Sequence, residues 1–311
     1  MFPKTGQKFQ QFYKPAIATR SIGRLLMGVV VLSILYIVFY IIFFAIIGIY
    51  FGFTGALNGF DLVAIRMKFG TVFLGNSPES VVLVLLSFTA MFLSVLATVK
   101  WVYKRGLSSL FGPDIGDVFR GFKGGFLFII AVSFVSIGLF SIINTPVKNL
   151  EFSTWIKWVW LAIPLIFLQT TSEELIFRGY LQQQLAARFN SRWAWYFLPS
   201  LAFGMLHYDP GTMGSNAWIL VLHTTLFGLI AAEVTARTGN LGTAMGLHFA
   251  NNLLALGVVT MDGPLSGLGL YKTAISVSDE VAIRPMMLSD LILTALLYGL
   301  YLLWCKKHPE L

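Results

Sequence analysis

The sequence predicts an all-α fold, a polytopic membrane helical bundle of about eight transmembrane helices. Of the 311 residues, 57% are hydrophobic and only 12% are charged, whereas soluble domains carry about 25% charged residues. The mean hydropathy is +0.77. Runs of about 20 apolar residues are long enough to cross a bilayer. Such candidate spans lie at about 25–51, 81–103, 124–143, 155–175, 193–208, 216–236, 241–260 and 287–305.

These spans belong to one domain, residues 1–311, because no long period repeats and no Ser/Gly linker divides the chain. The first apolar run is too long for the hydrophobic part of a cleavable signal peptide, so we expect a first spanning helix there. The single cysteine, Cys305, excludes an internal disulfide and a cysteine-based metal cluster. The polar motifs described below are confined to a core of about residues 155–257.

The basic residues set the expected orientation in the membrane. Lys and Arg outnumber Asp and Glu by 22 to 14, but the cations cluster beside apolar runs, where they determine topology. We therefore expect membrane lipid as a partner and no nucleic acid. The loops on alternate sides differ in charge, and the basic ones place both termini in the cytoplasm. The expected location is a prokaryotic inner membrane, with the endoplasmic reticulum as the alternative.

Ionisable residues form the first of three polar clusters inside the apolar stretches. Glu173 and Glu174 head the string Glu-Glu-Leu-Ile-Phe-Arg, which ends at Arg178. Ionisable groups at membrane depth cost free energy unless they are paired or hydrated, so they mark a functional site by default. Glu174 and Arg178 are spaced i, i+4 and share one helix face, so they can pair. Glu173 lies about 100° around the helix and is freer to face a different cavity.

Two later clusters complete the set and come to a similar depth. They are Phe-Gly-Met-Leu-His, ending at His207, and His-Phe-Ala-Asn-Asn, from His248 to Asn252. If the chain turns near residue 190, Glu173 and His207 each lie about 25 Å from that turn. A second turn signal at 238–240 puts His248 about 12 Å and Asn252 about 18 Å from its own turn. The spacing predicts that the side chains converge.

The chemistry of these residues suits a hydrolase, although each has a structural alternative. Desolvation and a nearby cation can tune a buried carboxylate such as Glu173 into a general base. His248 and Asn252, at i and i+4, can aim two donors at one point, as an oxyanion hole requires. Alternatively, the two glutamates mark a solvated helix end, His207 is a rim residue, and Asn252 joins neighbouring helices. Three such clusters in order favour the functional interpretation.

These residues resemble the motifs of a known family. Glu-Glu-x-x-x-Arg at 173–178, Phe-x-x-x-His at 203–207 and His-x-x-x-Asn at 248–252 are similar to those of the CPBP family. This family contains CAAX prenyl endopeptidases and bacteriocin-processing (Abi) proteins. The resemblance covers about residues 155–257, and the ordered triple is far more specific than any single motif.

The resemblance implies an intramembrane endopeptidase whose site opens to the cytoplasm. Glu173 would activate water with His207, while His248 and Asn252 would stabilise the oxyanion. Glu174 and Arg178 would order the site. The implied substrate is a membrane-associated peptide or protein, either a prenylated CAAX protein, a bacteriocin precursor or a membrane-bound regulator.

The cofactor prediction is none, with a zinc ion as the alternative. The chain lacks His-Glu-x-x-His, although Glu173, His207 and His248 could supply three zinc ligands. Two other functions remain open at this point. A non-catalytic scaffold could use the same fold to bind and regulate a membrane partner. A proton-coupled transporter would also need intramembrane ionisable residues, but the chain shows no inverted repeat.

Overall fold

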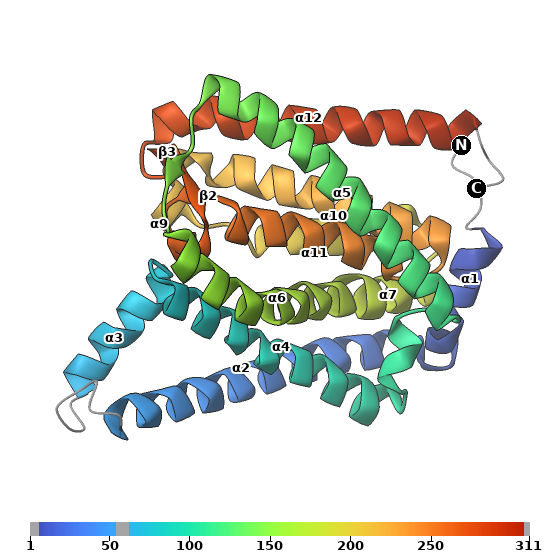
Figure 1. Cartoon of the computed structure of the whole chain (residues 1–311). Helices are drawn as coiled ribbons and strands as arrows, with labels where there is room; N and C mark the ends of the chain where they lie inside the picture. The colour runs from blue at the N-terminus through green and yellow to red at the C-terminus, as the bar shows by residue number, and fades with distance from the viewer. Residues whose placement is uncertain (1–5, 54–61, 308–311) are drawn as a thin grey trace.

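A computed structural model describes residues 6–53 and 62–307. It is a bundle of long helices with a small sheet at one end (Figure 1). In chain order the elements are α1 (Gln7–Tyr13), η1 (Lys14–Thr19), α2 (Ile22–Phe53), α3 (Leu62–Leu74), α4 (Pro78–Tyr103), η2 (Leu107–Leu110), α5 (Ile115–Ile143), β1 (Val147–Lys148), α6 (Phe152–Glu174), η3 (Leu175–Gln182), α7 (Gln183–Arg188), η4 (Trp193–Phe197), α8 (Leu198–Met205), α9 (Pro210–Met213), η5 (Gly214–Asn216), α10 (Ala217–Thr238), α11 (Gly242–Gly257), β2 (Val259–Asp262), η6 (Ser266–Leu268), β3 (Tyr271–Ser276) and α12 (Glu280–Lys307).

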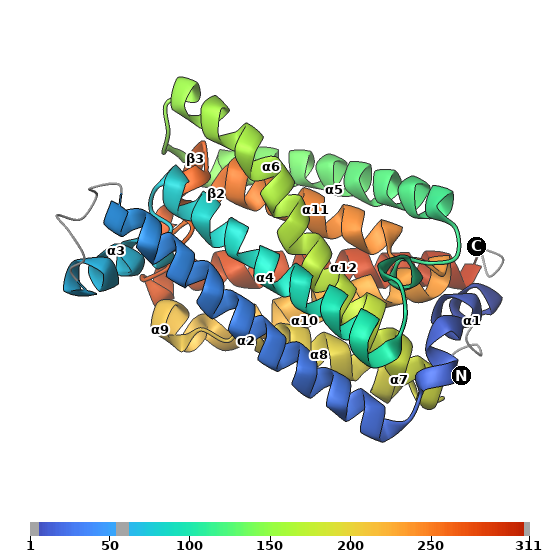
Figure 2. The ribbon, with the colours of Figure 1, turned by 90° about the horizontal axis from the view of Figure 1, so that it is seen from below.

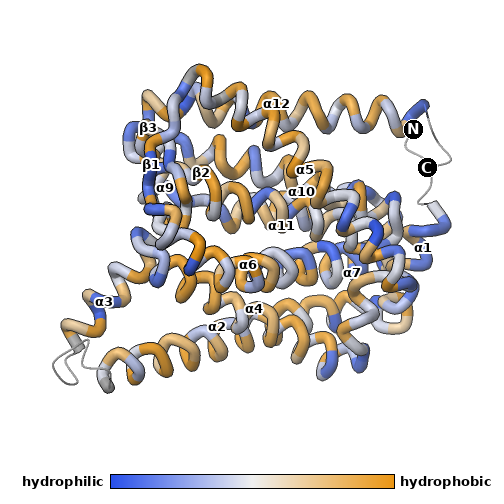
Figure 3. Tube along the Cα trace, viewed as in Figure 1, coloured by the Kyte–Doolittle hydropathy of each residue, from blue (hydrophilic) through white to orange (hydrophobic). Residues whose placement is uncertain are grey.

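The length and apolar composition of the helices confirm an all-α membrane bundle. Within the described residues, six helical stretches are long and apolar enough to cross a membrane. They are Ile22–Gly52, Pro78–Tyr103, Ile115–Leu139, Phe152–Arg188, Pro210–Thr238 and Glu280–Lys307. Hydrophobic residues run along these helices, and hydrophilic ones gather at the two ends of the bundle (Figure 3). The chain is therefore an integral, multi-pass membrane protein.

The expected count of eight spans was approximate, and two of the predicted spans correspond to shorter helices. The segment predicted at 193–208 is helical only to Met205. The chain then turns, and Asp209 caps the next helix, α9, by accepting a hydrogen bond from the Thr212 amide. The span predicted at 241–260 is α11, with 16 residues. It ends at Gly257, and strand β2 begins two residues later.

Three short strands close one end of the bundle. β3 lies in the middle of the sheet, antiparallel to β1 and parallel to β2, with Val147 opposite Lys272 and Val259 opposite Tyr271. Helix α1, the end of α12 and the turn after α7 lie at the opposite end of the bundle (Figures 1 and 2). The basic segments that the sequence placed on one side of the membrane therefore share one end of the structure.

One continuous helical segment carries the first polar motif. Helix α6 runs through Pro164 to Glu174 and continues through η3, a π-helical segment, into α7. The helix thus runs past the span expected at 155–175, and the chain turns near residue 190, as the comparison of depths assumed. π-helical turns inside α-helices occur frequently at functional sites, and this one begins at the residue directly after Glu174.

Helix α11 carries the third motif, and small residues fix it against α5. A Cβ atom on Gly242 or Gly246 would overlap the carbonyl oxygens of Val118 and Phe122. Only glycine allows this close approach of two backbones, which is a common device in membrane helix packing. The turn before α11 depends on Gly239, whose φ of +72° is in the left-handed region. The rotation and height of α11, and hence of His248 and Asn252, are set by these contacts.

Candidate active site

Glu174 and Arg178 form a buried ion pair at the centre of the site, as their i, i+4 spacing predicted. Nη1 of Arg178 donates to Oε1 of Glu174 at 3.0 Å, and the two side chains are 1% and 0% exposed. Nη2 of Arg178 also donates to the Gly228 carbonyl of α10 at 3.3 Å. The guanidinium lies 4.8 Å from the ring centre of Phe203 on α8. Arg178 therefore joins three helices around one carboxylate.

His248 lies between the two carboxylates. Its Nδ1 atom is 2.7 Å from Oε1 of Glu174, and its Nε2 atom is 3.4 Å from Oε2 of Glu173. The partner of one ring nitrogen decides which nitrogen carries the proton. Because a carboxylate oxygen only accepts, Nδ1–H donates to Glu174, while Nε2 faces Glu173. The edges of Phe203 and Phe227 pack around the imidazole, with ring centres 5.9 and 5.0 Å away.

Glu173 is held by a second set of contacts and is also buried, with 8% of its surface exposed. Nε2 of Gln169 donates to its Oε1 atom at 2.7 Å. Its Oε2 atom is buried and accepts no hydrogen bond, because the His248 ring at 3.4 Å is within ion-pair distance but is not a hydrogen-bond partner. A buried carboxylate oxygen without a donor is unusual in proteins and calls for an explanation.

Asn252 joins the cluster through Gln169 rather than through His248. Its Nδ2 atom donates to Oε1 of Gln169 at 3.0 Å, and its Oδ1 atom accepts from Nδ2 of Asn251 at 3.1 Å. His248 and Asn252 thus contact different side chains of α6, and their use as two donors to one point stays a prediction. Asn252 is half-buried, so it lies toward the accessible side of the cluster.

His207 lies next to this cluster without a direct hydrogen bond to it. Its Nδ1 atom is 2.9 Å from the carbonyl oxygen of Phe203, one turn earlier. The Phe203 ring contacts the imidazoles of both His207, at 4.8 Å between ring centres, and His248. His207 is half-buried. The structure thus brings together Glu173, Glu174, Arg178, His248 and Asn252, and places His207 across the Phe203 ring from them.

Gln169 is the site residue that the sequence analysis did not identify. It is 7% exposed and links Glu173 of α6 with Asn252 of α11. Its position one helical turn before Glu173 was a usable signal, since side chains at i and i+4 face each other on a helix. A polar amide at that position in an apolar span indicates a partner among the site residues.

The three-ligand zinc set that the sequence left open is not assembled. Among residues 6–53 and 62–307, no three His, Cys, Asp or Glu side chains are grouped to hold one metal ion. Glu173 and His248 are close, but the ring of His207 contacts Phe203 instead.

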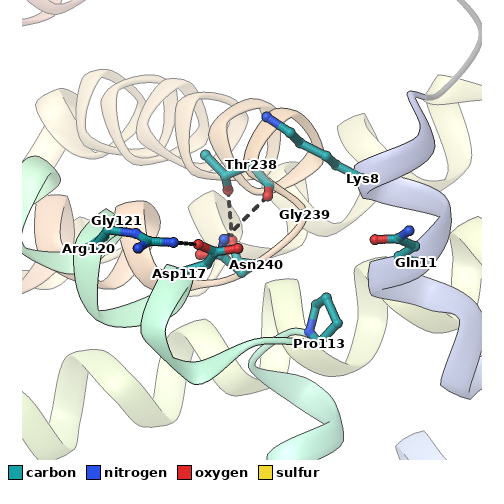
Figure 4. A pocket seen from close by; sticks show the side chains of 9 residues that line it. All are labelled: Lys8, Gln11, Pro113, Asp117, Arg120, Gly121, Thr238, Gly239 and Asn240. Carbon is teal, nitrogen blue, oxygen red and sulfur yellow. Dashed lines mark hydrogen bonds and ion pairs between the residues drawn. The ribbon is translucent and has the colours of Figure 1, made fainter.

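A separate pocket of about 430 Å³ lies near the end of the bundle that carries α1. It is lined by residues of α1, the start of α5 and the turn between α10 and α11 (Figure 4). Lys8 and Gln11 line one side, and an Arg120–Asp117 ion pair lines another. The residues lining this pocket include none of the polar cluster. Asn240, in the turn before α11, precedes His248 by eight residues.

The helical bundle and its buried polar cluster define an integral membrane protein with a candidate hydrolase site. Residues 155–254 match the family described as type II CAAX prenyl endopeptidase Rce1-like. This segment contains all three motifs and almost the whole predicted core of 155–257. This match confirms the resemblance to the CPBP family over that segment.

One curated protein is similar to part of the chain. The chain is 26% identical over 181 residues to the uncharacterized protein YyaK of Bacillus subtilis (strain 168). The similar region covers 56% of this chain and 59% of YyaK, so the match spans about three fifths of the relative's length. No solved structure matches the chain.

Proposed function

We propose that this chain is an intramembrane endopeptidase that cleaves a membrane-associated peptide or protein with water activated by Glu173. The observation that carries the proposal is the arrangement of Glu173, which is buried, lies in the family segment and has an Oε2 atom without a hydrogen-bond donor. Glu174 also has an Oε2 atom without a donor, but its Oε1 atom is held by Arg178 and His248. A general base needs a free lone pair within reach of the proton that it removes. The Oε2 atom of Glu173 has such a free lone pair.

The proposed reaction is a direct hydrolysis. The oxygen of a water molecule attacks the carbonyl carbon of the scissile peptide bond, and Oε2 of Glu173 takes a proton from that water. A tetrahedral intermediate with a negatively charged oxygen results. When the carbon–nitrogen bond breaks, Glu173 passes the proton to the leaving amine, which restores the carboxylate. Well-positioned general-base catalysis typically contributes about 10²–10⁴-fold in rate.

Neighbouring side chains have supporting roles in this proposal. The ion pair of Glu174 and Arg178 fixes the His248 ring through Nδ1, so that Nε2 points toward the reacting region. Asn252 donates a hydrogen bond to the developing oxyanion, a contribution worth about 10²–10³ in turnover in other hydrolases. His207, on the accessible side of Phe203, assists Glu173 once substrate and water fill the space between them.

The substrate class follows from the family and the location of the site. We propose a membrane-associated substrate, which includes a prenylated protein or a bacteriocin precursor, because the polar cluster is enclosed by membrane-spanning helices. We also propose that the end of the bundle with α1 and the α7 turn faces the cytoplasm, as its basic segments indicate.

The substrate can be found by comparing cells that carry the wild-type chain or Glu173→Gln. Membrane proteins and peptides are quantified by mass spectrometry, and the expected result is one or more uncut precursors that accumulate only with Glu173→Gln. Glu151→Gln is the matched control, since Glu151 begins the same helix but is exposed and pairs only with Lys148. Identical peptide profiles in all three strains would favour a non-catalytic scaffold over a protease.

A further inference from the structure

The amide of Gln169 connects two residues of the proposed reaction that come from different helices. Its Nε2 atom donates to Oε1 of Glu173 at 2.7 Å, and its Oε1 atom accepts from Nδ2 of Asn252 at 3.0 Å. The side chain is 93% buried, since 7% of its surface is exposed. Both ends of the amide are therefore engaged with proposed catalytic groups, and no other contact is needed to explain a glutamine in this apolar span.

The first contact distinguishes the two oxygens of Glu173. Because Gln169 donates to Oε1, that oxygen is a fixed acceptor, and Oε2 is the oxygen without a hydrogen-bond donor. We propose that Gln169 is a positioning residue that holds the Glu173 carboxylate in one rotamer and thereby presents Oε2 to the attacking water. This inference rests on the proposed function, because it assigns a role within that reaction.

The second contact orients Asn252. The Asn252 amide nitrogen has two hydrogens, of which one goes to Gln169. The Asn252 carbonyl is held by Asn251, so the amide cannot turn over without losing both contacts. The second hydrogen of Nδ2 is left for the substrate oxyanion. Gln169 thus sets the distance between the base on α6 and the oxyanion donor on α11.

Positioning of this kind acts on the chemical step more than on binding. Misplacement of a catalytic group by about 1 Å can cost about 10²-fold in rate, whereas substrate contacts elsewhere are unaffected. Gln169→Met, which is similar in size but neither donates nor accepts strongly, should therefore lower kcat on the order of 10–10²-fold. The KM should change by less than about 3-fold, because uniform binding is retained.

Gln182→Met is the matched control. Gln182 lies on the same continuous helical segment, is fully buried and donates one hydrogen bond to the Ala232 carbonyl at 3.0 Å. The substitution of Gln182 removes one buried hydrogen bond that involves neither Glu173 nor Asn252. Wild type, Gln169→Met, Gln182→Met and Glu173→Gln are purified and compared with a fluorogenic peptide that spans a cleavage site recovered from the precursor comparison. Gln169→Met should show a selective loss of kcat, and Gln182→Met should not.

Infrared spectroscopy gives a second readout that does not depend on turnover. The carboxylate band of Glu173 is assigned by difference against Glu173→Gln, and it should shift in Gln169→Met but not in Gln182→Met. An unshifted band, or equal kcat in the two glutamine variants while Glu173→Gln is inactive, would overturn the role of Gln169 and leave the proposed function standing. Wild-type activity in Glu173→Gln, or no cleavage by the wild type, would overturn the proposed function instead, and the band would still decide whether Gln169 holds Glu173.

Discussion

The Nδ1 atom of His248 lies 2.7 Å from Oε1 of Glu174, a shorter distance than the 3.4 Å between Nε2 of the same ring and Oε2 of Glu173. The same Glu174 oxygen also accepts from Arg178 at 3.0 Å. Glu174 is thus the point where the imidazole of α11 and the guanidinium of η3 meet. Glu173, which lies on a different face of the helix, contacts His248 less closely, and each of the two glutamates keeps its Oε2 atom without a donor.

Glu174→Gln should destabilise the protein more than Glu173→Gln does. The substitution leaves Arg178 buried without its counter-charge, and loss of one partner of a buried pair typically costs about 3–5 kcal/mol. Thermal unfolding of the purified protein in detergent would measure the difference. The exposed pair of Glu151 and Lys148 provides the control, since removal of a surface pair costs about 0–1 kcal/mol.

The same account predicts coupling between Glu174 and Arg178. The double variant Glu174→Gln with Arg178→Met should be less destabilised than the sum of the two single variants, because residues in direct contact are not additive. Additive losses in free energy of unfolding would mean that the pair is not formed in the membrane protein, and the support for His248 would have to come from elsewhere.

Cysteine labelling should place the two ends of the bundle on opposite sides of the membrane. In a Cys305→Ser background, Ser191→Cys and Ser278→Cys put single probes at exposed positions, near the α7 turn and just before α12. We expect an impermeant reagent added to intact cells to label the probe at 278 and not the one at 191. The opposite pattern would reverse the orientation inferred from the basic loops.

Activity should survive exhaustive chelation if Glu173 acts as a base. Removal of a catalytic metal would instead abolish water activation, and its return would restore it. Elemental analysis of the purified protein gives the matching observation, because Asn252→Ala should reduce turnover without changing metal content. Stoichiometric zinc that disappears together with activity in Glu173 or His207 variants would assign a metalloprotease.

The contacts that are local along one helix could be predicted from the sequence. The pairing of Glu174 with Arg178 follows from helical spacing alone, and the length of the helix that carries them follows from the absence of a break before residue 190. The position of His248 between the two glutamates does not follow from spacing. It depends on the rotation of α11 about its axis, which the glycine contacts of Gly242 and Gly246 with α5 determine.

Two features of the structure were beyond reach of straight-helix reasoning. His207 was expected near Glu173 because the two residues lie at equal depth. Depth does not determine the direction of a side chain, and the His207 ring contacts the Phe203 ring. The count of about eight spans was approximate, because apolar content alone does not show where a helix ends. In α11 the limit is set by the strand that follows Gly257.

The most direct test of the account is the cleavage rate of purified Glu173→Gln in lipid bilayers, measured beside the wild type with the same substrate. Gln preserves the size of the side chain and removes the base, so the protein should fold and melt like the wild type while kcat falls by about 10²–10⁴-fold. A well-folded Glu173→Gln protein that retains more than about a tenth of the wild-type rate would contradict the assignment of Glu173 as the general base.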